Sequence, residues 1–186
     1  MNESELREVP ISEKTMLHGD LFDVTYMQVR LPNGGTAKRE IVRHGVAAAA
    51  IVPVDADGNV YLVEQYRVGS DAITLEIPAG KQDSATEDNL VCAVRELEEE
   101  TGLHADHIEL MTRIYSAPAF CDEEIGIYLA TGLSQHRAHL DEDEFIHVVK
   151  LPLQEAVARA MRGEQPDSKT VIGLLMAARK LEDAHK

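Results

Sequence analysis

The stretch 95–102, RELEEETG, places four glutamates within five consecutive positions. If the stretch is helical, Glu96, Glu99 and Glu100 stand at i, i+3 and i+4 and share one face, whereas Glu98 points elsewhere. Each like-charged pair at this spacing costs an isolated helix about 0.2–0.5 kcal/mol. Hard divalent cations prefer oxygen ligands, and Mg²⁺ is usually held by carboxylates together with substrate phosphates and water. The spacing therefore indicates either a metal site or a solvated acidic face.

The segment 87–101 carries the clearest helical pattern in the chain. Its apolar side chains recur at i, i+3, i+4 and i+7, at Leu90, Ala93, Val94 and Leu97. Gly102 supplies a stop signal directly after the segment. The pattern predicts that the apolar stripe packs against the rest of the protein while the carboxylates face outward. Arg95 stands four residues before Glu99 and is placed to hold that carboxylate.

Short apolar and β-branched runs on both sides of this segment indicate strands. They occupy residues 22–29, 46–55, 60–68, 73–78, 108–115, 124–130 and 145–150. The turn-forming cluster at 55–59 predicts that the two strands flanking it pair as a hairpin. Two helical patterns lie between 153 and 185, with an interruption near 163–166. This order of strands, one helix mid-chain and helices at the end predicts an α+β fold or an α/β sandwich.

Composition limits the classes of function. The 186 residues fit one domain, or one domain with an added subdomain, and the formal net charge of −15 repels nucleic acid phosphates and acidic membranes. We therefore expect neither nucleic acid nor a membrane as a partner. Cys92 and Cys121 do not suggest a disulfide framework, so we expect buried thiols and a cytoplasmic location. The histidines at 44, 104, 107 and 147 show no metal-ligand spacing among themselves.

Residues 80–103 resemble the Nudix box, in which a glycine, a spacer and a glutamate precede seven residues and the motif Arg-Glu-apolar-any-Glu-Glu-any-Gly-apolar. The second half matches at every position, whereas the spacer has six residues instead of the usual five. The runs EQYR at 64–67 and LEIPAG at 75–80 resemble the ADP-ribose pyrophosphatase branch. Pro118 stands fifteen residues beyond the box, as is common in that branch, although its surroundings depart from the usual Ser-Pro-Gly.

The resemblance implies a Nudix-type α/β/α sandwich with a mixed sheet, formed by residues 45–186, and an N-terminal β segment at 1–44 through which the chain forms a homodimer. It also implies Mg²⁺, with Mn²⁺ as a substitute. The implied metal ligands are the carbonyl of Ala79 and the carboxylates of Glu96, Glu99, Glu100 and Glu144. Arg95 and Glu87 would orient these ligands.

Glu142 and Glu144 match a Glu-x-Glu pair that this branch carries on an acidic loop after the box. By resemblance, one of them activates water and the other helps to hold metal, and we favour Glu142 as the base. A plain acidic surface loop is the alternative interpretation.

The reaction implied is hydrolysis of ADP-ribose, or of a related nucleoside diphosphate sugar, to AMP and ribose 5-phosphate. The resemblance places six residues against the substrate, namely Arg39, Glu40, Arg43, Arg67, Lys81 and Glu123. An ordinary surface arginine explains Arg67 nearly as well. Two alternatives stay open: a Nudix pyrophosphatase for another dinucleotide or nucleotide sugar, and a nucleotide-binding sensor that does not cleave. The complete set of charged residues in the box speaks against the sensor.

Overall fold

The computed structural model describes residues 5–136 and 145–184. The chain divides into two compact units. The N-terminal unit consists of residues 1–45 and 115–123, and the larger unit of residues 46–114 and 124–186. Along the described residues, no helix is both long enough and apolar enough to cross a membrane.

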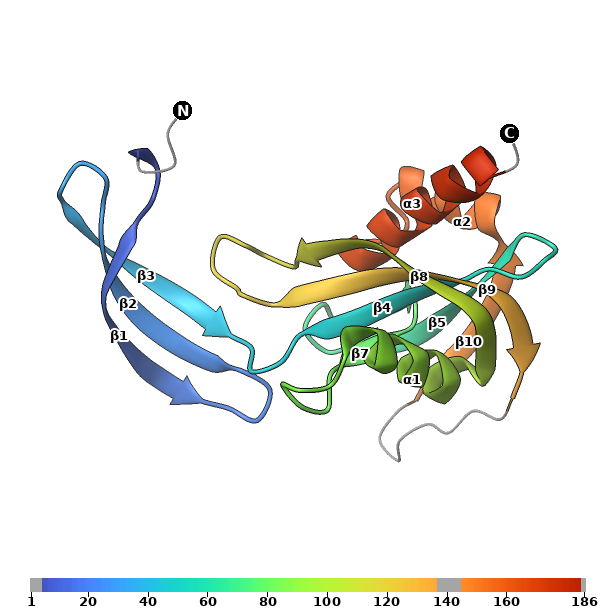
Figure 1. Ribbon diagram of the computed structural model, residues 1–186, viewed down its shortest axis with the longest axis horizontal. Coiled ribbons are helices and arrows are strands. Elements are labelled where there is room, and N and C mark those ends of the chain that lie inside the picture. Colours follow the sequence, from blue (N-terminus) through green and yellow to red (C-terminus); the bar gives the residue numbers. More distant parts are fainter. Residues whose placement is uncertain (1–4, 137–144, 185–186) are drawn as a thin grey trace. The chain divides into compact units, whose positions relative to one another are not determined.

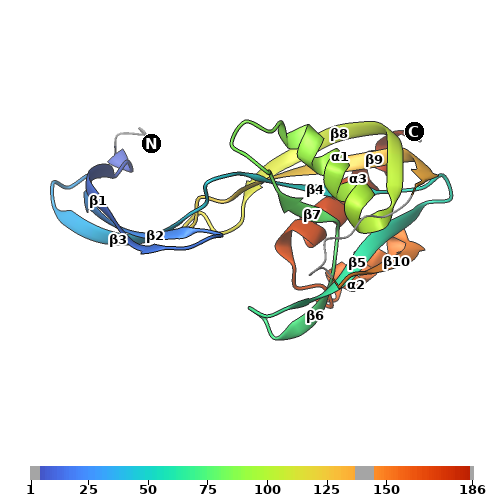
Figure 2. The same cartoon turned by 90° about the horizontal axis from the view of Figure 1, so that it is seen from below.

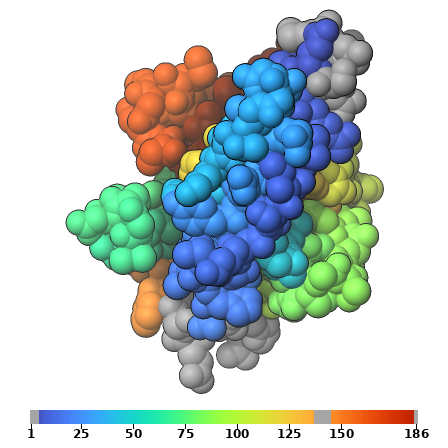
Figure 3. All heavy atoms as spheres, turned by 90° about the vertical axis from the view of Figure 1, so that its left-hand side faces the viewer, coloured from blue at the N-terminus to red at the C-terminus, as the bar shows by residue number. Residues whose placement is uncertain are grey.

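The N-terminal unit contains a three-stranded antiparallel sheet (Figure 1). Its strands are β1 (Val9–His18), β2 (Asp23–Arg30) and β3 (Thr36–Arg43), in that order across the sheet. All ten residues of the edge strand β1 are exposed, and the strand carries several apolar side chains. Figure 3 shows this sheet in blue, facing the viewer.

The larger unit contains a mixed four-stranded sheet and a second, three-stranded sheet (Figure 2). The first has the order β7 (Ala79–Lys81), β4 (Ala48–Pro53), β9 (Glu124–Gln135) and β8 (Leu103–Tyr115). Strand β4 runs parallel to β9 and antiparallel to β7. The second sheet has the order β10 (His147–Pro152), β5 (Asn59–Arg67) and β6 (Ala72–Glu76).

Helices α1 (Asn89–Thr101) and α3 (Ser168–Ala184) cover opposite faces of the four-stranded sheet, and α2 (Leu153–Met161) packs against α3 and the second sheet (Figure 1). Strand β4 explains this arrangement, because all six of its residues are buried and successive side chains point to opposite faces. Ala49 and Ile51 pack with α1, whereas Ala50 and Val52 pack with α3. The predicted α/β/α sandwich with a mixed sheet is confirmed.

The predicted hairpin between the strands flanking residues 55–59 is wrong. Beyond β4, only an isolated bridge joins Val54 to Val60, and the chain then passes into the other sheet. The reason is that β4 lies in the interior of its sheet, where β7 and β9 already occupy both of its edges. Local turn signals could not reveal these more distant partners.

Helix α1 begins later than predicted and ends where predicted. Asp88 caps it, because its carboxylate accepts a hydrogen bond from the Leu90 N–H at 2.8 Å, so the first helical residue is Asn89. At the other end, Gly102 adopts the left-handed conformation with φ of 67°, which glycine tolerates without strain.

The buried face of α1 also differs from the predicted stripe. Leu90 is 40% exposed and Val94 is only partly buried. The buried residues are Asn89, Cys92, Ala93, Glu96, Leu97, Glu100 and Thr101. Two of the carboxylates that were expected to face outward therefore point toward the sheet.

Candidate active site

Glu96 and Glu100 lie on the inner side of α1, beside strand β7, and are only 7% and 3% exposed. The Ala79 N–H donates a hydrogen bond of 3.0 Å to Oε2 of Glu100. Gly80 lies against Glu96, because a Cβ placed on this glycine would stand 2.0 Å from Oε1 of Glu96. Both carboxylates thus lie against the β7 backbone, which supplies an N–H donor and leaves room for their oxygens.

Arg95 links the acidic residues of the box. One of its terminal nitrogens donates to Glu96 at 2.7 Å and to Glu99 at 2.9 Å. The other donates to the carbonyl oxygen of Lys81 at 2.8 Å, while Nε contacts Glu87 at 3.4 Å. The predicted pairing of Arg95 with Glu99 is confirmed, and the pairing with Glu96 is an additional finding.

The pKa of Arg95 lies above its ordinary value. Burial by itself lowers the pKa, but the negative charge of Glu96 and the hydrogen bonds to Glu99 and Glu87 outweigh burial. The guanidinium is therefore permanently charged, and it offsets the repulsion among the glutamates of the helix.

Glu87 closes the loop that precedes α1. Its Oε2 accepts a hydrogen bond of 2.7 Å from the Asp83 N–H, and its other oxygen faces Arg95. The carboxylate of Asp83 also lies 3.5 Å from Arg95. The six-residue spacer is thus accommodated within this loop while Glu87 still reaches the arginine.

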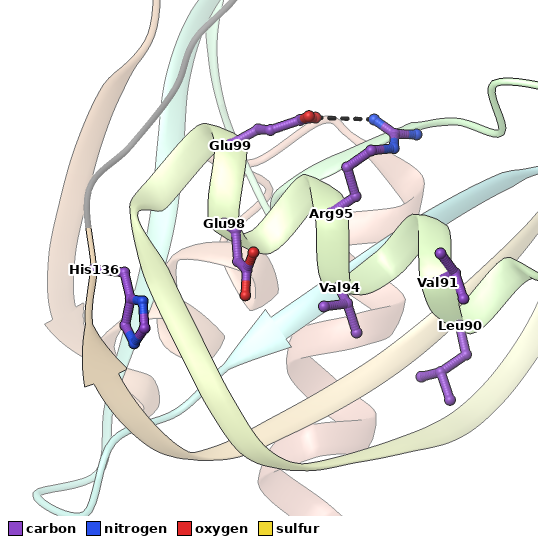
Figure 4. A pocket seen from close by; sticks show the side chains of 7 residues that line it. All are labelled: Leu90, Val91, Val94, Arg95, Glu98, Glu99 and His136. Atoms are coloured by element: carbon purple, nitrogen blue, oxygen red, sulfur yellow. Dashed lines mark hydrogen bonds and ion pairs between the residues drawn. The ribbon is translucent and has the colours of Figure 1, made fainter.

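An open hollow of about 730 Å³ borders the outer side of α1 (Figure 4). It is lined by Leu90, Val91, Val94, Arg95, Glu98, Glu99 and His136. In Figure 4 the joined Arg95 and Glu99 lie along the upper side, with His136 at the left and Leu90 and Val91 at the right. The carboxylate of Glu98 contacts Nδ1 of His104, outside the box, at 2.9 Å. Arg95 and Glu99 line this hollow, so it adjoins the glutamates of the box. Its volume suits a small-molecule ligand.

A family model described as the NUDIX domain matches residues 43–172. The chain belongs to the Nudix family. It is 41% identical over 169 residues to a methanol dehydrogenase activator from Bacillus methanolicus, covering 90% of both chains. It is 37% identical over 171 residues to an ADP-ribose pyrophosphatase from Bacillus subtilis (strain 168), covering 91% of both. A crystal structure of an ADP compounds hydrolase matches 98% of both chains with a TM-score of 0.84 and 26% identity.

These similarities identify the chain as a Nudix hydrolase. The residues that resemble the Nudix box lie mainly on α1 and the loop that precedes it. Nudix hydrolases generally use divalent metals, and the residues present fit a hard cation. Glu96, Glu99 and Glu100 offer only oxygen donors, and the first and last are held against β7. Glu96 and Glu99 share Arg95, whereas Glu100 bonds the β7 backbone. This arrangement suits ions held by one or two carboxylates each, completed by water and phosphate oxygens.

A second buried charge cluster surrounds Glu76, which is 2% exposed. Arg67 binds its carboxylate through two nitrogens, at 2.9 and 2.8 Å, and Lys169 approaches to 2.5 Å. Burial by itself raises the pKa of Glu76, but Arg67, Lys169 and the Thr74 hydroxyl outweigh it and hold the pKa at about 2. Sequence reasoning missed this cluster, since Lys169 lies 93 residues beyond Glu76 and carries no local signal.

Arg67, which was predicted to bind a phosphate, is thus paired with Glu76 in the larger unit. The hydrogen bonds to Glu76 raise the pKa of Arg67, burial lowers it, and the negative charges of Glu76 and Glu100 raise it further. Lys81 lies in β7, and its carbonyl oxygen accepts the bond from Arg95. Their contacts with substrate stay predictions.

The remaining substrate-binding candidates belong to the N-terminal unit. Arg39 pairs with Glu8, and Glu40 accepts a hydrogen bond of 2.7 Å from the Tyr26 hydroxyl. Further contacts join Arg43 to Glu13 and Asp122, and Glu123 to His44. The two candidate catalytic glutamates at 142 and 144 lie outside the described residues.

Proposed function

We propose that the chain is a Mg²⁺-dependent pyrophosphatase that cleaves ADP-ribose, or a related nucleoside diphosphate sugar, into AMP and ribose 5-phosphate. The observation that carries the proposal is the set of three glutamates on α1, two of them buried against β7 and two of them joined by Arg95. The similarity to an ADP-ribose pyrophosphatase and to an ADP compounds hydrolase supports this choice of substrate.

In this proposal, Glu96, Glu99, Glu100 and the Ala79 carbonyl hold Mg²⁺. When bound, the metal neutralises the diphosphate and lowers the pKa of water. Arg95 keeps Glu96 and Glu99 in position, and Glu87 holds Arg95 from the other side. We assign Glu142 as the group that accepts the proton of the attacking water, with Glu144 as a further ligand. The oxygen of that water bonds to one phosphorus, the bond between that phosphorus and the bridging oxygen breaks, and the bridging oxygen leaves with the other phosphate.

A second candidate is cleavage of another dinucleotide or nucleotide sugar. The observation that favours it is that the chain is 41% identical to a methanol dehydrogenase activator and 37% identical to an ADP-ribose pyrophosphatase, so similarity alone does not single out ADP-ribose. The box sets the chemistry, whereas residues outside it select the substrate. Both candidates therefore predict the same dependence on the glutamates of α1.

We also propose that the N-terminal strands mediate a homodimer. Four apolar side chains of β1, at Val9, Ile11, Met16 and Leu17, are exposed, and the strand forms an unpaired sheet edge. Exposed apolar edge strands are sites of association between chains.

The experiment that tests the proposed activity is a screen of nucleoside diphosphate compounds with Mg²⁺ or Mn²⁺, measuring the nucleoside monophosphate released. We expect ADP-ribose to be cleaved with the highest kcat/KM. Glu100→Gln should abolish turnover without unfolding the protein, because an amide oxygen can still accept the bond from the Ala79 N–H. Glu98→Gln is the matched control on the same helix. Near-normal activity of Glu100→Gln would remove the metal assignment, and preference for another compound would establish the second candidate.

A further inference from the structure

We propose that His44, Cys121 and Glu123 form a binding site for a zinc-class cation, separate in chemistry from the glutamates of α1. All three residues belong to the N-terminal unit. One potential ligand atom from each lies within 4.8 Å of the other two. The histidine follows the end of β3, and the thiol and the carboxylate come from the segment 115–123.

The distances suit a tetrahedral ion. The Cys121 sulfur lies 3.5 Å from Nδ1 of His44. Zn–S and Zn–N bonds of about 2.3 and 2.05 Å at a tetrahedral angle require a separation of about 3.6 Å between sulfur and nitrogen. An oxygen of Glu123 lies 3.9 Å from Nε2, the other ring nitrogen of His44. On an ion bound by Nδ1, the carboxylate therefore completes the set after its side chain rotates toward the sulfur and Nδ1. Three protein ligands leave a fourth position for water.

Backbone contacts hold the two contributing segments together. The Val42 N–H donates to the Phe120 carbonyl at 2.7 Å, and the Asp122 N–H donates to the Val42 carbonyl at 3.2 Å. These bonds form a parallel bridge between Val42 and Cys121. The thiol and the imidazole are thus brought into contact although they lie 77 residues apart in the chain. This separation explains why no spacing pattern among the histidines indicated the site.

Neighbouring groups position the potential ligands. The Asp122 carboxylate accepts the His44 backbone N–H at 2.7 Å, and its other oxygen pairs with Arg43 at 3.2 Å. The Glu123 N–H points at the Cys121 sulfur at 3.5 Å, and the Ser116 hydroxyl lies 3.7 Å from it. These contacts hold the sulfur in place beside the imidazole.

The donor set selects the class of cation. A thiolate, an imidazole and a carboxylate match Zn²⁺, or Co²⁺ as its spectroscopic substitute, whereas Mg²⁺ prefers oxygen ligands. The glutamates of α1 offer only oxygen. The protein therefore carries two candidate sites with opposite preferences, and excess Mg²⁺ can saturate one while the other is measured.

The test is a Co²⁺ titration of the untagged, reduced protein in excess Mg²⁺ and without substrate. We expect a thiolate-to-cobalt charge-transfer band that one equivalent of Zn²⁺ removes. Cys121→Ser and His44→Gln should abolish this band, and Glu123→Gln should weaken Zn²⁺ binding about 10- to 100-fold. Cys92→Ala is the matched control, because Cys92 is the other cysteine of the chain and lies in α1 of the larger unit.

Thermal unfolding supplies an independent measurement. Zn²⁺ should raise the melting temperature of the wild type and of Cys92→Ala but leave that of Cys121→Ser unchanged, since a ligand stabilises only the fold that binds it. Circular dichroism establishes that each variant is folded before titration. The absence of a charge-transfer band in the wild type, or its persistence in Cys121→Ser, would overturn the proposal. Both readings are taken without substrate, so they do not depend on the activity proposed above.

Discussion

Gly80 lies so close to the carboxylate of Glu96 that a Cβ at this position would stand 2.0 Å from Oε1 and 2.6 Å from Oε2. The glycine is required here for space, because its φ does not lie in the left-handed region. Strand β7 can therefore run directly against a buried carboxylate of α1. As a result, Gly80 at the start of the Nudix box lies in contact with Glu96 near its centre.

Gly80→Ala should lower kcat about 10- to 100-fold, because the added methyl group displaces Glu96 from its position against β7. The measurement is turnover as a function of Mg²⁺ concentration, together with the melting temperature. Gly69→Ala is the matched control, since no atom lies within 4 Å of a Cβ at that position. Full activity of Gly80→Ala would show that the position of Glu96 is not critical.

Arg95→Lys should also lower kcat about 10- to 100-fold while the protein stays folded. A lysine keeps the charge, but its single ammonium cannot reach Glu87, Glu96, Glu99 and the Lys81 carbonyl together, as the planar guanidinium does. Steady-state kinetics with the preferred substrate provide the measurement.

The control for this variant is Arg159→Lys. Arg159 on α2 also binds a glutamate four positions away, Glu155, at 3.0 Å, but these two side chains are 40% and 44% exposed. The Arg159→Lys variant should retain wild-type kinetics. Equal effects of the two substitutions would mean that Arg95 acts only through helix stability.

The contribution of Glu76 to stability should depend on pH. Its pKa falls from an ordinary value of 4.5 to about 2 in the folded protein. The stabilisation is therefore fully present above about pH 4.5 and is lost as the pH falls toward 2. A shift of this size corresponds to about 3 kcal/mol, and Glu76→Gln should lose a similar amount at neutral pH because Arg67 and Lys169 lose their charged partner.

Urea unfolding between about pH 6 and pH 3 measures this dependence. The wild type should lose stability over this range more steeply than Glu76→Gln, so that the two curves approach each other at low pH. Glu164→Gln, which removes an exposed carboxylate paired with Arg162, should follow the wild type. Parallel curves for the wild type and Glu76→Gln would contradict the role assigned to the cluster.

The features predicted correctly from the sequence are those set by local spacing. Gly102 ends α1 because a glycine can adopt the left-handed conformation there. Arg95 binds Glu99 because residues four apart on a helix are neighbours. The spacing of the charged residues also revealed the resemblance to the Nudix box. That resemblance in turn implied the α/β/α sandwich fold.

The predictions that failed concern features that depend on contacts between residues far apart in the sequence. The apolar pattern favoured burial of Leu90 and exposure of Glu96 and Glu100, yet both glutamates are buried. Arg95 offsets the cost of burying Glu96, and the Ala79 N–H offsets that of burying Glu100. A periodicity of hydrophobic residues contains no information about such partners. The same holds for Lys169 and Glu76, which meet only through tertiary structure.

Leu17→Asp should convert the proposed homodimer into a monomer. The side chain is 53% exposed on edge strand β1, so the substitution leaves the fold of the single chain intact but introduces a charge that an apolar interface cannot solvate. Light scattering coupled to size-exclusion chromatography measures the mass of both proteins. Ile73→Asp is the matched control, because this side chain is 73% exposed on β6 in the larger unit. A monomeric wild type, or a Leu17→Asp variant that keeps the dimer mass, would refute the assignment of the interface to the N-terminal strands.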